Sequence, residues 1–483
     1  MNHKLICKLI GNVLRIEAVF MFFPLIVSLI YGEGDHPAFL WSMIISLVAG
    51  TALAGFNPTD KNFRARDAFV VAGLSWILLS LFGALPFCFS GYFDSFIDCV
   101  FESVSGFTTT GSSILTDVEA LPKGILFWRS FSHWIGGMGV LTFMMAVMPS
   151  VNASSVNLLR AESTGPSPDK IVPKIRETAR IMYLIYFVMT VLLLMLLRAT
   201  GLPWYDAFMN AFSTAGTGGF SHLNTSIGGY DNMAAEVIIT VFMFLFGINF
   251  SLFFILIGRK FVRFAKNSEL KVYFGIVIVS TLLIALNISG LYGGFFAALR
   301  HSSFQVSSII STTGFATTDF NLWPTLSQSI LVILMLTGCC AGSTGGGIKL
   351  VRVIILCKAA KVELDKIFHP GSVKAVSLNG KKVNQEIVLK TALFFFLYFA
   401  AFFVSLSLLS IEGTDLVSSA TAVIASLSNI GPGLGMVGPT GNYAAFSSFS
   451  KVVLSFCMIA GRLEFFPLIV LFTPSVWKKG RVK

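Results

Sequence analysis

The sequence predicts an all-α integral membrane protein, with four pseudo-repeats around one pore and two additional transmembrane helices at the N-terminus. Three observations predict this fold class. First, the 483-residue chain is 55% hydrophobic and only 12% charged, about half the charged fraction of a soluble protein. Second, long apolar runs recur at 181–197, 237–257 and 388–409, and about 20 apolar residues cross a bilayer as a helix. Third, a polar, glycine-containing segment occurs four times.

The distribution of positive charge predicts the orientation of the chain. Lys and Arg are concentrated in one set of segments and absent from another; the first set is 61–66, 160–180, 259–271, 352–390 and 478–483, and the second is 31–37, 202–232 and 412–448. The positive-inside rule places the first set and both termini in the cytoplasm. The net charge of +11 follows from this topology, so no nucleic-acid partner is expected. A basic inner face could also meet anionic lipid or an acidic partner.

The recurring segment is first seen as SGFTTTGSS at 105–113. Three similar segments follow at 213–221, 308–315 and 425–432, and the four align on Gly111, Gly219, Gly314 and Gly431. Each follows a run of mixed polarity that is too short to span a bilayer; these runs are 98–105, 206–213, 301–308 and 418–425. Internal repetition of this kind predicts a repeated structural unit. The unit consists of a span, a short helix, a polar glycine loop and a second span.

Ten full spans follow from this pattern, because two further apolar segments precede the first unit. The predicted spans are 13–31, 38–56, 68–90, 124–148, 179–200, 233–258, 272–294, 326–355, 388–410 and 450–473. The corresponding parts of the chain are 1–60 for the two N-terminal transmembrane helices, 61–150 for pore repeat 1, 151–265 for repeat 2, 266–365 for repeat 3, and 366–483 for repeat 4 with the C-terminal tail.

The four loops are interpreted as parts of an ion filter. Irregular backbone survives at membrane depth only where it is buried in protein or lines an aqueous path. Four such loops around one axis could replace the water shell of a cation with carbonyl oxygens and threonine hydroxyls. Glycine permits the required backbone angles, and the short helices would direct their negative C-terminal ends at the ion. The alternative is that small residues only allow close helix packing, which explains one such segment more easily than four.

A second glycine-rich segment interrupts the apolar run that begins at residue 330. Its glycines cannot sustain a regular helix without a loss of stability; the residues of interest are Gly342, Ser343, Thr344, Gly345, Gly346 and Gly347. The segment is either a kink at a packing site or a flexible loop beneath the filter that obstructs the pore. We favour the second interpretation, a gate.

Arg462 lies within the last predicted span. An arginine at membrane depth is costly and suggests a function, although backbone carbonyls or snorkelling to the interface could also satisfy it. The hypothesis is that Arg462 projects into the pore near the loop at 338–347, where its positive charge resists the passage of cations.

Other motifs in the chain are weak. The pattern at 433–438 matches a dinucleotide fingerprint, but it follows no strand and opens no βαβ unit. The segment 342–349 resembles a phosphate loop, which leaves a membrane enzyme acting on a phosphate-bearing substrate as a less favoured alternative. The seven cysteines match no metal or haem spacing. No enzymatic activity and no cofactor within this chain are expected.

Several segments together resemble the Trk family of bacterial potassium uptake proteins, within the superfamily that includes the Ktr and plant HKT transporters. The segments are 101–111, 131–139, 160–162, 338–349, 429–435 and 461–464. The resemblance covers essentially the whole chain and includes the two additional N-terminal spans. It implies potassium uptake across the bacterial inner membrane by a homodimer in the lipid bilayer, regulated by a cytoplasmic nucleotide-binding partner of the RCK type (TrkA-like).

The resemblance also assigns the potassium-binding and gating residues. The filter carbonyls would come from Thr109, Thr110 and Gly111; Thr217, Gly218 and Gly219; Thr312, Thr313 and Gly314; and Asn429, Ile430 and Gly431. The gate would comprise residues 342–347 and Arg462. Sodium-preferring relatives often carry serine at the first filter glycine, so glycine in all four loops favours potassium. The loops are not identical, which leaves a sodium-conducting or sodium-coupled transporter as the alternative, and symport with protons or sodium is left open.

Overall fold

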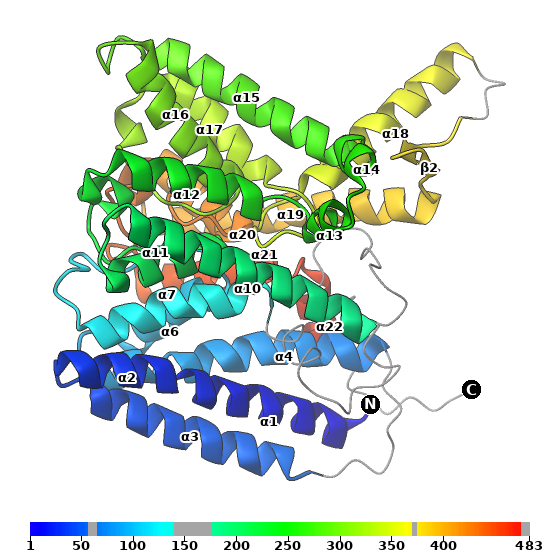
Figure 1. The fold of residues 1–483 in the computed structure, drawn as a ribbon. Helices are drawn as coiled ribbons and strands as arrows, with labels where there is room; N and C mark the ends of the chain where they lie inside the picture. The colour runs from blue at the N-terminus through cyan, green and yellow to red at the C-terminus, as the bar shows by residue number, and fades with distance from the viewer. Residues whose placement is uncertain (57–64, 140–174, 370–373, 475–483) are drawn as a thin grey trace.

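The computed structural model describes residues 1–56, 65–139, 175–369 and 374–474, and nearly all of its regular structure is helical (Figure 1). The α-helices are α1 (His3–Phe20), α2 (Phe22–Tyr31), α3 (His36–Ala54), α4 (Ala65–Gly83), α5 (Leu85–Ser90), α6 (Phe96–Phe107), α7 (Lys123–Gly137), α10 (Ile175–Ala199), α11 (Trp204–Gly216), α12 (Met233–Phe246), α13 (Phe250–Ile257), α14 (Phe261–Ala265), α15 (Ser268–Ile288), α16 (Phe295–Ile310), α17 (Thr325–Thr337), α18 (Leu350–Phe368), α19 (Gln385–Ser410), α20 (Leu416–Ser428), α21 (Ser448–Arg462) and α22 (Phe466–Phe472).

Short elements complete the described part of the chain. Three 3₁₀ helices lie in loops, namely η1 (Ser226–Tyr230), η2 (Phe320–Leu322) and η3 (Gly435–Val437). One antiparallel hairpin pairs β1 (Ser377–Leu378) with β2 (Lys381–Lys382). The structure therefore confirms the predicted all-α fold class.

Six of the described helical segments are long and apolar enough to cross a membrane, and eight are if each of two bent pairs counts as one span. The bent pairs are α12 with α13, at an angle of 96°, and α21 with α22, at an angle of 120°. In Figure 1, α1, α3, α4 and α10 run in roughly the same direction through the molecule. These eight segments correspond to eight of the ten predicted spans.

The remaining two predicted spans are only partly regular helix. The span predicted at 124–148 begins as α7, and its residues beyond 139 lie outside the described part of the chain. The span predicted at 326–355 is α17 followed by irregular backbone and then α18, which continues to Phe368. The helix α18 continues beyond the predicted end of the span at 355, because Leu350–Phe368 keeps helix-forming residues after the apolar run has ended.

Four short helices, α6, α11, α16 and α20, occupy the positions predicted for half-length helices, and each is longer than predicted at both ends. Side-chain caps fix two of the starts: the Ser95 hydroxyl accepts from the Asp98 N–H, and the Asp415 carboxylate accepts from the Ser418 N–H. Such caps satisfy amides that a helix leaves without partners in its first turn.

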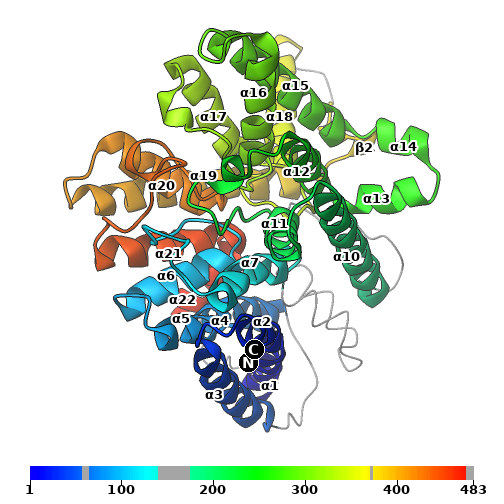
Figure 2. The same ribbon diagram turned by 60° about the vertical axis from the view of Figure 1, so that its left-hand side comes forward.

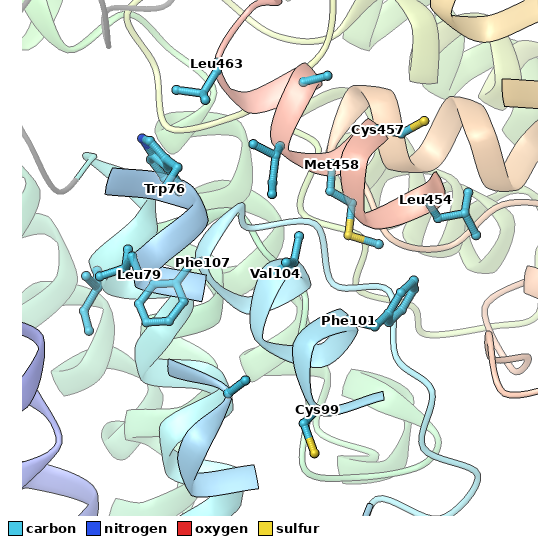
Figure 3. Close-up of a cluster of buried hydrophobic side chains, with 14 of the residues drawn as sticks. Trp76, Leu79, Cys99, Phe101, Val104, Phe107, Leu454, Cys457, Met458 and Leu463 are labelled. Atoms are coloured by element: carbon cyan, nitrogen blue, oxygen red, sulfur yellow. The ribbon is translucent and has the colours of Figure 1, made fainter. Parts of the chain in front are cut away.

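The first and last repeats pack against each other. Phe101, Val104 and Phe107 of α6 lie in one buried cluster with Leu454 and Met458 of α21 (Figure 3). Figure 2 shows α21, from the C-terminal part of the chain, beside α6. Because elements 350 residues apart in sequence share one core, the repeats close on themselves instead of forming a row.

Candidate functional site

The four glycine loops have the same backbone geometry. The first residue of each is left-handed, with φ of 56° at Thr109, 54° at Thr217, 61° at Thr312 and 55° at Asn429. The aligned glycines also have positive φ, from 78° at Gly219 to 95° at Gly431. Between them lies a residue with negative φ, and this alternation turns successive carbonyls toward one side of the chain. The pattern is that of a left-handed helix cap extended by one glycine.

Matching hydrogen bonds end the four short helices. The N–H of Thr110 donates to the Ser105 carbonyl, and the equivalent bonds join Gly218 to Ser213, Thr313 to Ser308, and Ile430 to Ala425, at 2.8–2.9 Å. Each bond folds the loop back against the C-terminal end of its own helix. The four helices therefore present their negative ends at the base of equivalent loops.

The loops contact one another in a closed ring. A Cβ atom on Gly111 would lie 2.0 Å from the carbonyl oxygen of Gly218, one on Gly219 2.0 Å from that of Thr313, and one on Gly314 2.0 Å from that of Ile430. The ring closes where a Cβ on Gly431 would lie 2.7 Å from the carbonyl oxygen of Thr110. Real side chains do not approach backbone so closely, so each glycine is required both by its φ and by the neighbouring loop.

The side chains of the ring are buried and most are held by the protein. The Thr110 hydroxyl contacts that of Thr108 at 2.8 Å and accepts from Asn429 at 3.0 Å, and the Thr313 hydroxyl contacts that of Ser311 at 2.7 Å. The Thr217 hydroxyl donates to the Gly216 carbonyl at 2.7 Å. Among the described residues, the Thr109 hydroxyl has no hydrogen-bond partner. The backbone carbonyls are therefore better available to a cation than the threonine hydroxyls that the sequence also suggested.

A buried ion pair supports the first loop from behind. Glu102 of α6 and Arg129 of α7 are 0% and 2% exposed, and their charged atoms are 2.7 Å apart. Arg129 also donates to the Ser113 hydroxyl at 3.1 Å, and Glu102 accepts from the Ile114 N–H at 3.1 Å. Sequence reasoning missed Glu102. An acid in a pore helix and a base in the following span is the signal that could have identified the pair.

The fourth loop has a partner of its own. The Tyr443 hydroxyl donates to the Gly431 carbonyl at 2.7 Å, and the Tyr443 N–H donates to the Ser113 carbonyl at 2.8 Å. Tyr443 therefore links the fourth loop to the first. The Gly431 carbonyl, predicted as a cation ligand, already has this protein donor.

The glycine-rich segment predicted as a gate lies directly against the third and fourth glycine loops. The Gly346 N–H donates to the Thr312 hydroxyl at 2.7 Å. A Cβ on Gly345 would lie 2.5 Å from the Ser311 carbonyl oxygen, and one on Gly346 2.3 Å from that of Ser428. The segment is buried, with Thr344 fully inaccessible to solvent. It is thus wedged between the third and fourth loops, on the side where their helices end.

Two basic side chains hold this segment. Arg462 donates to the Thr344 carbonyl at 2.7 Å and, across the structure, to the carbonyls of Gly136 and Gly137. Lys349, which the sequence analysis did not single out, is 1% exposed and donates to the Gly345 carbonyl and to the Ser343 hydroxyl. Arg462 therefore lies beside the loop, as hypothesised, and is satisfied by carbonyls, as the alternative interpretation required.

The surroundings of the phosphate-loop and dinucleotide-like motifs do not favour nucleotide or phosphate binding. In the phosphate-loop pattern, the Lys349 amine lies against the backbone of its own loop. The dinucleotide-like pattern at 433–438 contains η3 and follows α20, with no strand before it. Glu464, near Arg462 in sequence, pairs with Arg352 of α18.

Comparison with known proteins agrees with this architecture. A family model described as TrkH, cation transport protein, matches residues 35–290 and 296–479. The chain is 35% identical over 487 residues to the Trk system potassium uptake protein TrkH of Salmonella typhimurium, covering 99% of this chain and all of the relative. It is 32% identical to the Trk system potassium uptake protein TrkG of Escherichia coli, covering 98% and 99% of the two chains.

A solved structure is similar over the same length. The crystal structure of the potassium transporter TrkH from Vibrio parahaemolyticus matches 99% of this chain and 100% of that chain, with a TM-score of 0.89 and 32% identity. The likeness includes the part of the chain that carries the loop ring. The family match, the relatives and the shared fold agree that this chain belongs to the TrkH family of cation transport proteins.

Proposed function

We propose that this chain takes up potassium through the ring of four glycine loops, across the inner membrane of a bacterial cell. The observation that carries the proposal is the closed sequence of contacts from Gly111 through Gly219 and Gly314 to Gly431, each against a carbonyl of the next loop. Relatives of this length and identity are named as potassium uptake proteins. A ring of carbonyls can replace the hydration shell of a cation.

Each part of the ring contributes to this mechanism. The cation would be bound by backbone oxygens from Thr109–Gly111, Thr217–Gly219, Thr312–Gly314 and Asn429–Gly431. The negative ends of α6, α11, α16 and α20 would stabilise its charge. Below the ring, the segment 342–347 fills the path, and the guanidinium of Arg462 adds a positive charge that opposes a cation. Conduction then requires the segment to move.

The remaining parts of the proposal follow from the same topology. Both termini would be cytoplasmic, and the chain would divide into the N-terminal pair of helices at 1–60 and four pore repeats at 61–150, 151–265, 266–365 and 366–483. It would act as a homodimer with a cytoplasmic RCK-type nucleotide-binding subunit, TrkA-like, on its basic inner face. Light scattering of the purified protein tests the dimer, and co-purification with such a subunit tests the partner.

A sodium-conducting protein is the second candidate, because the loops are chemically unequal. The middle residue is threonine in the first and third loops but Gly218 in the second and Ile430 in the fourth. This asymmetry weakens any argument from fourfold symmetry for discrimination between potassium and sodium.

Flux measurements in liposomes test the proposal. Rubidium and sodium uptake are compared in proteoliposomes with a defined proton gradient, for the unaltered chain and for Gly111→Ser. We expect rubidium to enter faster than sodium. The serine variant, whose Cβ would lie 2.0 Å from the Gly218 carbonyl oxygen, should lose most of its rubidium flux and part of that preference. Faster sodium than rubidium uptake by the unaltered chain would favour the second candidate, and unchanged flux in the variant would remove the ring from the mechanism.

A further inference from the structure

A cavity of about 1610 Å³ adjoins the gate segment, and its described lining contains no residue of the filter ring. One end of the cavity is lined by Ser343 of the gate segment, Arg462 and Gly137. The other end is lined by the turn before α14, by α14 itself, by the start of α15 and by the β1–β2 hairpin. These elements come from two separate parts of the sequence, 258–271 and 378–383, which the fold brings together around one space.

The outer end of the cavity is strongly basic. Seven Lys and Arg residues line it, namely Arg259, Lys260, Arg263, Lys266, Lys271, Lys381 and Lys382. Within the described lining, Glu269 is the one carboxylate, and one of its oxygens already accepts from the Ala341 N–H at 2.8 Å. In the described part of the chain, no ion pair joins any of the seven to a carboxylate. Such a concentration of one charge attracts an anion.

The basic rim is held in place by packing and hydrogen bonds. The Ser268 N–H, at the start of α15, donates to the Asn379 side chain of the hairpin at 2.7 Å. Phe264 of α14 and Leu378 of β1 pack against the same hydrophobic cluster. The positive-inside rule alone would account for basic residues on this face, but it does not require them to surround one space on elements tied to each other.

Exposed apolar side chains adjoin the basic ones. Ile257, Phe261 and Val262 are 70%, 61% and 68% exposed, and they lie in the same short stretch of sequence as Arg259, Lys260 and Arg263. In Figure 2, α13 and α14 stand out from the side of the bundle. A soluble anion gains nothing from apolar neighbours. A lipid supplies both an acidic headgroup and an acyl chain, and short segments that mix aromatic and basic residues lie at such interfaces.

We propose that the basic rim of this cavity is a binding site for the phosphate headgroup of an anionic phospholipid of the cytoplasmic leaflet. Phe261 and Val262 contact the acyl region beside it. The bound headgroup offsets positive charge at the inner end of the path below the gate segment. The binding can be measured without any transport, so its test is independent of the function proposed above.

The test measures binding of fluorescent phosphatidylglycerol to the full chain in detergent, with fluorescent phosphatidylcholine as the neutral comparison. The rim variant carries Arg263→Gln, Lys266→Gln and Lys381→Gln. The matched control carries Lys361→Gln, Lys374→Gln and Lys390→Gln, which removes the same charge from exposed positions outside the cavity. Each basic residue near an anionic surface contributes about fivefold in affinity, so we expect a loss on the order of a hundredfold in the rim variant and little change in the control.

A second variant and two competitors identify the ligand. Phe261→Ser with Val262→Ser should weaken phosphatidylglycerol binding, and glycerol phosphate and a polyglutamate peptide should displace the lipid only at much higher concentrations. Equal losses in the rim and control variants, or equal binding of phosphatidylcholine, would overturn the proposal. Displacement by glycerol phosphate at the lipid's own concentration would assign the rim to a soluble anion, and tighter binding of polyglutamate would assign it to an acidic protein. Melting curves of all variants verify that they fold.

Discussion

The filter ring and the gate segment lie in contact but are built in different ways. The ring is made four times from equivalent backbone, and its contacts are between a glycine and a carbonyl of the next loop. The gate segment occurs once, between α17 and α18, and long basic side chains hold it. One of these, Arg462, comes from 118 residues further along the chain than its acceptor Thr344.

This difference indicates how each region responds to change. The ring cannot accommodate a side chain at its glycines, because a Cβ atom at any of them would overlap the neighbouring loop. The gate segment is fastened by hydrogen bonds that can be made and broken individually, each worth about 1.5–3 kcal/mol when a charged group takes part. This arrangement of a tightly packed ring and a segment held by side chains is consistent with the filter and gate proposed above.

The largest expected effect belongs to the ring. Gly219→Ala would place a Cβ atom 2.0 Å from the Thr313 carbonyl oxygen, at a residue with a φ of 78°. The left-handed conformation alone costs about 1–2 kcal/mol for a residue with a Cβ, so we expect rubidium flux into proteoliposomes to fall at least about tenfold.

Gly275→Ala is the matched control for this variant. Gly275 lies within α15, where an added Cβ would meet nothing within 4 Å, and alanine favours a helix over glycine. Its flux should equal that of the unaltered chain. If Gly219→Ala conducts as well as Gly275→Ala, the loops do not form the path and the comparison between ring and gate segment fails.

An intermediate effect of opposite sign is expected for the gate. Arg462→Gln removes the charge and the bond to the Thr344 carbonyl, which leaves the segment 342–347 less firmly held. Basal rubidium flux in the absence of any partner subunit should rise about tenfold, the equivalent of one charge-assisted hydrogen bond. A fall in flux, from protein whose melting curve is unchanged, would contradict the role proposed for Arg462.

A smaller rise is expected for Lys349→Gln. Lys349 donates to the Gly345 carbonyl four residues before it, so it stiffens the segment internally but does not tie it to another helix. We expect basal flux to increase only about threefold, less than for Arg462→Gln, because the lost bond joins the segment to itself and leaves its attachment to other helices in place. In the double variant with Arg462→Gln the two effects should not add, because both act on one segment. Strictly additive effects would show that the two side chains act on different barriers.

Much of the ring could be predicted from sequence because the chain repeats it. Gly111, Gly219, Gly314 and Gly431 each follow a short helix, and membrane physics restricts irregular backbone to buried or pore-lining places. Because the segment occurs four times, a shared functional role explained the pattern better than close helix packing did. The break at 338–347 was visible for a similar reason, since glycines interrupt an apolar run.

The side-chain contacts that hold the ring and the gate segment in place could not be predicted in the same way. Each of these contacts occurs once and is not part of the repeat: Glu102 with Arg129, Lys349 with Gly345, and Tyr443 with Gly431. Lys349 stands next to a glycine run and reads equally well as the first residue of a basic cytoplasmic segment. Its amine points into the loop at 342–347 only because of the tertiary packing. Contacts of this kind leave no periodic pattern in the sequence.

The smallest effect is expected at the outer end of the fourth short helix, where Asp415 caps α20 with its carboxylate. The hydrogen bond from the Ser418 backbone N–H lowers the pKa of Asp415. A lowered pKa in the folded state stabilises the protein above the ordinary aspartate pKa of about 3.9, and that contribution is lost as the pH falls through the lowered value.

Asn also caps helices but does not titrate. Asp415→Asn should therefore melt close to the unaltered chain at pH 7 and show a shallower decline in Tm below about pH 4, whereas Asp94→Asn, at another exposed position, should keep the original decline. An identical decline in Asp415→Asn would show that the cap of the fourth helix carries no charge-dependent stability.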